Sequence, residues 1–140
     1  KLIQNGMQHK IYSGIYAMDG GKHLCCVEDW DEEYYKNNGC FKFLSCEEGD
    51  AKLKNNHKTV KCAYVGMGCM AIKKGVIEDE RFKYPWFFRN ITEFNHNGEI
   101  ITDGTSEDVS FIRNLIDSGV IQYIPVDLSL RFGHEKHIVY

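Results

Sequence analysis

Proline is scarce in this chain, at two positions in 140 residues. The sequence also contains no internal repeat, no low-complexity segment and no Pro- or Ser-rich linker, so its composition marks no domain boundary. With 43% hydrophobic and 13% aromatic residues, the chain is long enough to bury one sizeable core. We therefore expect a single domain that spans residues 1–140.

An excess of positive charge is missing as well. The formal net charge is −3, the isoelectric point is near 6.1, and lysine and arginine are scattered along the chain. Binding to a nucleic-acid backbone requires a clustered basic surface. This distribution therefore predicts no nucleic-acid partner.

Long apolar runs are also missing. No segment approaches the roughly 20 consecutive apolar residues that cross a bilayer. Residues 1–6 lack the hydrophobic region of a signal peptide. We expect a soluble, cytoplasmic protein with no membrane span.

Cysteine pairs at metal-binding spacing do not occur. The six cysteines lie at positions 25, 26, 40, 46, 62 and 69, and no two form a Cys-x-x-Cys pair. Structural zinc sites usually show that spacing, and small disulfide scaffolds are shorter and richer in cysteine. We therefore expect reduced, mostly buried thiols. Cys25 and Cys26 lie in an apolar run and should point to opposite faces of a strand.

Short strands and turns fill the first half of the sequence. Residues 10–18 and 23–28 are predicted strands that form a hairpin across Asp19-Gly20-Gly21. The four acidic residues within 29–33 predict the start of a short helix, and Gly39 predicts its end. We expect a strand over residues 41–44 and a loop or marginal helix over residues 45–58.

The second half of the sequence alternates between the residue spacing of strands and that of helices. Strands are predicted over residues 59–64 and 69–72, with a break at Gly66-Met67-Gly68. A short helix is expected over residues 73–80 and a hairpin over residues 91–94 and 99–102. Apolar residues at helical spacing predict a helix over 106–118 that Gly119 ends, and strands follow over 121–126 and 130–134. Together these elements predict a mixed α/β (α+β) layer fold.

Five motifs follow one another along the chain. They are Ser13-Gly14-Ile15-Tyr16, residues 65–74, Tyr84-Pro85-Trp86-Phe87, Ser106-Glu107-Asp108-Val109-Ser110-Phe111 and Arg131-Phe132-Gly133-His134. Their order resembles the C-terminal half of GT-A-fold, family 2-like glycosyltransferases, over about residues 10–136. The resemblance implies a partial GT-A-like sheet with flanking helices and β-hairpins. It also implies transfer of a sugar from a nucleotide-sugar donor to a glycan acceptor, assisted by a divalent cation such as Mn²⁺ or Mg²⁺.

The same resemblance assigns roles to individual residues. Asp108 would be the general base on the attacking sugar hydroxyl, with Glu107 as helper or substitute. His134 would help to hold the divalent cation on the donor diphosphate. The acceptor groove would be lined by Gly66, Gly68 and Trp86. A carboxylate and an imidazole suit this chemistry, because transfer requires a base near the hydroxyl and a cation beside the leaving group.

The donor half of such enzymes lies upstream and ends in an Asp-x-Asp motif. Residues 1–6 resemble the helix that follows that motif, so the motif is expected before Lys1, and we expect the isolated fragment to be inactive. Asp29-Trp30-Asp31 matches the pattern but follows the first strand, so we interpret it as a helix cap. No Gly-rich phosphate loop replaces the missing half.

Simpler interpretations stay open for each site residue. Residues 105–108 also fit a capping box, in which Thr105 bonds the backbone of Asp108 and Asp108 reaches back. His134 also fits a surface histidine, and Trp86 a core residue. For the whole chain, the alternative is a noncatalytic binding or assembly module that retains the fold, as a homodimer that covers the open sheet edge.

Overall fold

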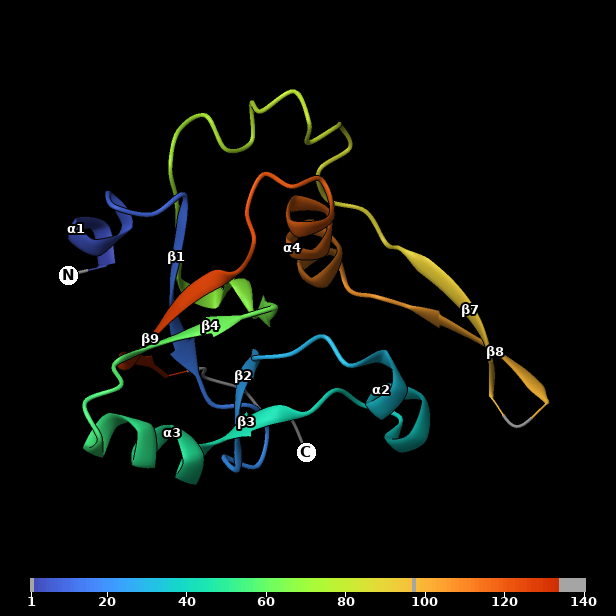
Figure 1. Ribbon diagram of the computed structural model, residues 1–140, viewed down its shortest axis with the longest axis horizontal. Coiled ribbons are helices and arrows are strands. Elements are labelled where there is room, and N and C mark those ends of the chain that lie inside the picture. The colour runs from blue at the N-terminus through green and yellow to red at the C-terminus, as the bar shows by residue number, and fades with distance from the viewer. Residues whose placement is uncertain (1, 97, 134–140) are drawn as a thin grey trace, which may run out of the picture.

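The computed structural model describes residues 2–96 and 98–133, and it has the expected mixed α/β composition (Figure 1). The helices are α1 (Leu2–Gly6), α2 (Glu32–Asn38), α3 (Cys46–Lys54), α4 (Glu107–Asp117) and the short 3-10 helix η1 (Met67–Cys69). The strands are β1 (Ile11–Tyr16), β2 (His23–Val27), β3 (Phe43–Ser45), β4 (Thr59–Cys62), β5 (Tyr64–Val65), β6 (Met70–Ile72), β7 (Ile91–His96), β8 (Glu99–Gly104) and β9 (Ile124–Phe132).

The strands form two packed sheets and a separate hairpin. The larger sheet has the order β4-β9-β1-β6, in which β1 and β9 are parallel and the other two pairs are antiparallel. The smaller sheet has the antiparallel order β3-β2-β5. Parallel strands require a crossover connection, and α4 lies within the one that joins β1 to β9. The hairpin of β7 and β8 extends away from the rest of the protein (Figure 1).

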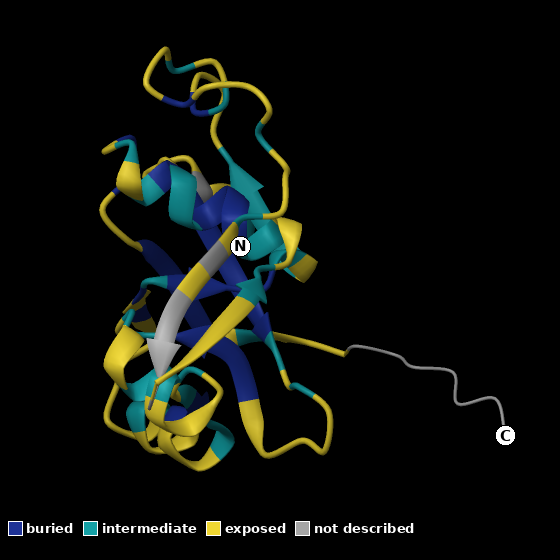
Figure 2. Ribbon diagram, turned by 90° about the vertical axis from the view of Figure 1, so that its right-hand side faces the viewer, coloured by how far each residue is buried: buried dark blue, intermediate teal, exposed yellow. Residues whose placement is uncertain are grey.

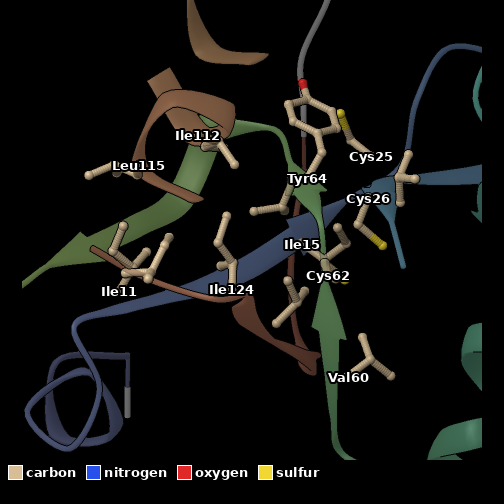
Figure 3. Close-up of a cluster of buried hydrophobic side chains, with 14 of the residues drawn as sticks. Ile11, Ile15, Cys25, Cys26, Val60, Cys62, Tyr64, Ile112, Leu115 and Ile124 are labelled. Atoms are coloured by element: carbon tan, nitrogen blue, oxygen red, sulfur yellow. The ribbon is translucent and has the colours of Figure 1, made fainter. Parts of the chain in front are cut away.

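The hydrophobic core lies where α4 meets both sheets. Phe111, Ile112 and Leu115, on the inner face of α4, are fully buried. Figure 3 shows Ile112 and Leu115 facing Ile11 and Ile124 of the larger sheet. Buried residues concentrate in the strands and on α4, whereas the turns are exposed (Figure 2). The 3.6-residue periodicity of α4 therefore marks the face that packs.

Helix caps follow the predicted chemistry at α2. Asp31 is the N-cap and accepts a hydrogen bond from the Tyr34 backbone N–H at 2.8 Å. Gly39 ends the helix with a left-handed φ of 71°, a conformation that glycine adopts without steric cost. The interpretation of Asp29-Trp30-Asp31 as a cap is confirmed, through Asp31.

A capping box stabilises a helix within residues 45–58, for which the sequence predicted a loop or a marginal helix. Ser45 accepts from the Glu48 N–H at 3.1 Å, and the Glu48 carboxylate accepts from the Ser45 N–H at 2.9 Å. These two bonds satisfy backbone donors at the start of α3. Residues 46–54 are therefore helical.

The helix predicted over residues 73–80 is wrong. Gly75 has a left-handed φ of 91°, which interrupts a right-handed helix, and the segment forms consecutive turns. Val76 and Phe82 are buried and attach it to the core. These buried apolar residues therefore hold the turns against the core.

Two further boundaries differ from the prediction. The turn after β1 forms, with a 2.8 Å bond from the Met18 N–H to the His23 carbonyl, but β1 and β2 then enter different sheets. The two strands predicted over 121–126 and 130–134 are one strand, β9, within the described residues. Buried Asp127, which accepts from the Tyr12 hydroxyl at 3.1 Å and the Ser129 hydroxyl at 2.6 Å, continues the strand through a polar position.

The predicted hairpin at residues 91–102 is confirmed and is longer than expected. Its strands pair antiparallel from Ile91 opposite Gly104 to His96 opposite Glu99. Within residues 2–96 and 98–133, no helix has the length and apolar character to cross a bilayer.

The cysteines are all free thiols, as expected, and half of them are buried. Cys25 and Cys26, adjacent on β2, are both buried, because β2 is covered on its two faces. Cys62 is buried and hydrogen-bonded with Cys26. Cys40 is exposed, and Cys46 and Cys69 are half-buried.

Candidate functional site

Asp108 lies in the first turn of α4 and is held from both of its carboxylate oxygens. The Tyr64 hydroxyl donates to Oδ2 at 3.0 Å, across 44 residues of sequence. The Val109 backbone N–H donates to Oδ1 at 2.8 Å, and the Ser106 hydroxyl donates to the same oxygen. The carboxylate is half-buried and fixed in orientation by these donors.

Tyr16, at the end of β1, lies beside the same group. Its hydroxyl is hydrogen-bonded with the Cys25 thiol, and the Asp108 charge acts on it electrostatically. Figure 3 shows the Cys25 sulfur next to the Tyr64 ring, whose hydroxyl points away from the aliphatic core. We call Tyr16, Cys25, Tyr64 and Asp108 the hydroxyl–carboxylate cluster.

The Gly66-Met67-Gly68 segment packs directly against this cluster. A Cβ atom on Gly66 would lie 2.1 Å from the Tyr16 hydroxyl oxygen and 2.7 Å from the Cys25 sulfur. A Cβ on Gly68 would lie 2.8 Å from Cε1 of the Tyr16 ring. Glycine is therefore required here for close approach of the Tyr16 ring, and the structure brings Gly66, Gly68 and Asp108 to one place.

Burial governs the protonation of both tyrosines. Desolvation is the main cause that raises the pKa of Tyr64 far above its usual value, and Cys25 and Asp108 raise it further. Desolvation and the Cys25 hydrogen bond likewise raise the pKa of Tyr16. Both side chains are thus neutral hydroxyl donors across the physiological pH range.

The other predicted site residues are Glu107, Trp86 and His134. Glu107 is exposed on the neighbouring position of α4. Trp86 is half-buried, packs against the core and contacts the Tyr84 ring edge-on at 5.6 Å, which agrees with the core interpretation. His134 lies outside the described residues.

The capping-box interpretation of residues 105–108 is wrong. Ser106 is the N-cap of α4 and makes no side-chain cap bond. The Thr105 hydroxyl instead contacts the Ser110 hydroxyl at 2.5 Å and donates to the Asn90 carbonyl at 3.4 Å. Asp108 accepts a hydrogen bond from Tyr64, which is 44 residues away and outside α4. Helix capping therefore does not account for the orientation of the Asp108 side chain.

Sequence reasoning missed Tyr64 and Cys25 as members of the site. Tyr16 lies in the Ser-Gly-Ile-Tyr motif, but the family resemblance assigns no role to it. Tyr64 stands two residues before Gly66, so a polar aromatic residue next to a Gly-x-Gly turn was the available signal. The four residues of the cluster lie together only because β1, β2, β5 and α4 pack against one another in the folded protein.

Residues 2–96 and 98–133 contain no group of three His, Cys, Asp or Glu side chains that could hold a metal ion. Mg²⁺ and Mn²⁺ prefer several oxygen ligands. Asp108 would be one such ligand, but no two further His, Cys, Asp or Glu side chains join it within the described residues. The described residues therefore do not fit a complete cation site.

Alkaline titration tests the cluster. We expect Tyr64 to stay protonated above pH 10, where exposed tyrosines ionise. Because the folded pKa exceeds the unfolded value, the neutral hydroxyl contributes stability that is present below about pH 10 and is lost as pH rises toward the folded pKa. The substitution Asp108→Asn should lower the Tyr64 pKa yet leave it above its usual value, since burial is the larger cause.

Carbon NMR of labelled tyrosine rings, with Tyr64→Phe for assignment, detects the pH at which Tyr64 begins to ionise as the pH is raised. The variant Glu107→Gln removes a carboxylate one position away and should leave the Tyr64 titration unchanged. A Tyr64 pKa that does not respond to Asp108→Asn would contradict the hydrogen bond.

Comparison of the chain with protein-family models, curated proteins and solved structures gave no match.

Proposed function

We propose that this chain forms the acceptor-side, base-carrying portion of a glycosyltransferase that moves a sugar from a nucleotide-sugar donor to a glycan acceptor with a divalent cation. The observation that carries the proposal is that Tyr64 donates to Asp108, while Tyr16, on which the Asp108 charge acts, packs against Gly66 and Gly68. Residues that the resemblance assigns to the base and to the acceptor groove thus lie together.

In the proposed chemistry, Asp108 takes the proton of the acceptor hydroxyl. The hydroxyl oxygen then forms a bond to the anomeric carbon of the donor, and the bond from that carbon to the diphosphate breaks. The nucleoside diphosphate leaves with the bonding electrons. A cation would stabilise the charge on that leaving group.

The neighbours of Asp108 suit a positioned base. Tyr64, Ser106 and the Val109 N–H fix both carboxylate oxygens, and fixed groups favour a reactive geometry. In the proposal, His134 helps to hold the cation, as the resemblance implies.

A binding experiment tests this proposal on the chain itself. With isotope-labelled protein, neutral oligosaccharides should shift the amide signals of Gly66, Gly68 and Asp108 in a saturable manner. A nucleoside diphosphate with Mg²⁺ should shift His134. If neither ligand moves any of these signals, the proposal is wrong.

One observation favours the assembly module as a second candidate. The edge strand β6 and α1 border a groove lined by Ile3, Met7, Ala71, Ile72 and Lys73, and Ile3 and Met7 are 76% and 71% exposed. A second copy that covers this edge would bury those side chains. Sedimentation that shows a dimer, together with no response to glycans, would favour this candidate.

We also propose a cytoplasmic location. Its support is the six cysteines, which are all free thiols, three of them buried.

A further inference from the structure

A second site lies between α2 and the β7–β8 hairpin. It is a cavity of about 210 Å³. We call it the α2–β8 cavity. This volume lies below the roughly 300–1,000 Å³ of pockets for drug-sized ligands, so it suits one small ring. Its lining residues are Trp30, Glu32, Tyr35, Lys36, Phe41, Glu93, Asp103 and Thr105.

Aromatic rings form its apolar side. Phe41 stacks with Trp30 at 4.0 Å and with Tyr35 at 4.8 Å, and the Arg113 guanidinium lies over the Trp30 ring at 4.6 Å. These contacts use the ring faces that a cage for a quaternary ammonium ion requires. The rings therefore serve as a rigid apolar wall.

Carboxylates form its polar side. Glu32, Glu93 and Asp103 oppose the single ammonium of Lys36, which leaves the lining with a net charge of −2. The Tyr35 hydroxyl donates to Asp103, and this bond is the main cause that raises the Tyr35 pKa to about 12. Carboxylates accept hydrogen bonds from hydroxyl groups and repel anions.

We propose that the α2–β8 cavity binds one uncharged sugar ring. The aromatic side chains that line the cavity offer apolar contacts to the C–H groups of the sugar, and the carboxylates accept hydrogen bonds from its hydroxyls. The negative lining excludes uronic acids and phosphorylated sugars.

The cavity adjoins the first turn of α4. Thr105 lines it and stands three residues before Asp108, and Arg113 of α4 covers Trp30. We therefore assign the cavity to a further ring of the glycan whose reacting sugar lies at Asp108. This substrate assignment, a glycan of more than one sugar, rests on the proposed function.

Titration of labelled protein with neutral mono- and disaccharides tests the assignment. The indole N–H of Trp30 should shift saturably, and glucuronic acid should produce no shift at equal concentration. Because hydrogen bonds to charged groups are strong, Glu32→Gln and Glu93→Gln should each weaken binding about 10-fold.

The matched controls are Glu33→Gln on α2 and Glu99→Gln on β8, which are exposed and do not line the cavity. They should leave the affinity unchanged. All four positions are exposed, so none of these substitutions should affect folding.

Three results would overturn the cavity assignment. They are equal binding of glucuronic acid, preferential binding of choline, and sugar-induced shifts at Gly66 and Gly68 without any at Trp30. The last result would leave the transferase proposal intact. Conversely, binding at Trp30 without any response at Gly66, Gly68 or Asp108 would support the cavity and overturn the transferase proposal.

Discussion

Replacement of Asp108 by asparagine is expected to lower the rate of sugar transfer by about 100- to 10,000-fold, the usual contribution of a general base. The amide has the shape of the carboxylate and can keep a hydrogen bond with Tyr64, but it cannot take the proton of the acceptor hydroxyl. Release of nucleoside diphosphate measures the rate. The assay compares the variant with the unsubstituted protein under identical conditions.

Glu107→Gln is the matched control, because it makes the same chemical change one residue away at an exposed position. We expect it to retain most of the activity. An equal loss in both variants would mean that the pair acts as a unit, and a loss confined to Glu107→Gln would assign the base to Glu107. Glycan binding by Asp108→Asn should persist, which separates the loss of catalysis from a loss of the site.

Phe111→Ala should have the largest effect on stability, about 3–5 kcal/mol. The Phe111 ring is fully buried, and it stacks with Phe87 at 4.4 Å and meets Phe82 edge-on at 5.3 Å. Its removal leaves a cavity on α4, the helix that carries Asp108. Urea unfolding followed by circular dichroism measures the change in the free energy of unfolding.

Ile100→Ala provides the comparison for a large apolar residue at an exposed position. Ile100 is 74% exposed on β8, so its truncation should change the free energy of unfolding by no more than about 0.5 kcal/mol. Equal effects of the two substitutions would show that Phe111 does not pack in the core as described.

Local chemistry made several elements predictable. Val109, Ile112 and Leu115 repeat at helical spacing, and Gly119 has the left-handed φ of 73° that follows the helix. The same holds for α2, where Asp31 and Gly39 are the caps. These signals act within a few residues, so the sequence displays them directly.

Other segments depended on distant partners. Residues 73–80 have a helical pattern, yet Gly75 is left-handed and Val76 is held in the core. Asp127 breaks the apolar pattern of β9 but is paired with Tyr12 of β1. A buried polar group is tolerated where a partner exists, and the sequence does not show which partner that is.

By itself, the sequence determined the mixed α/β composition, the two caps of α2 and the β7–β8 hairpin, because each depends on neighbours along the chain. The candidacy of Asp108, Gly66 and Gly68 came from the family resemblance. Only the tertiary structure decided that Tyr64 donates to Asp108, that Tyr16 fills the space beside the two glycines, and that α2 and β8 enclose a cavity. Those contacts join residues 44 or more positions apart, and they form because burial of both sheets against α4 brings the strand ends together.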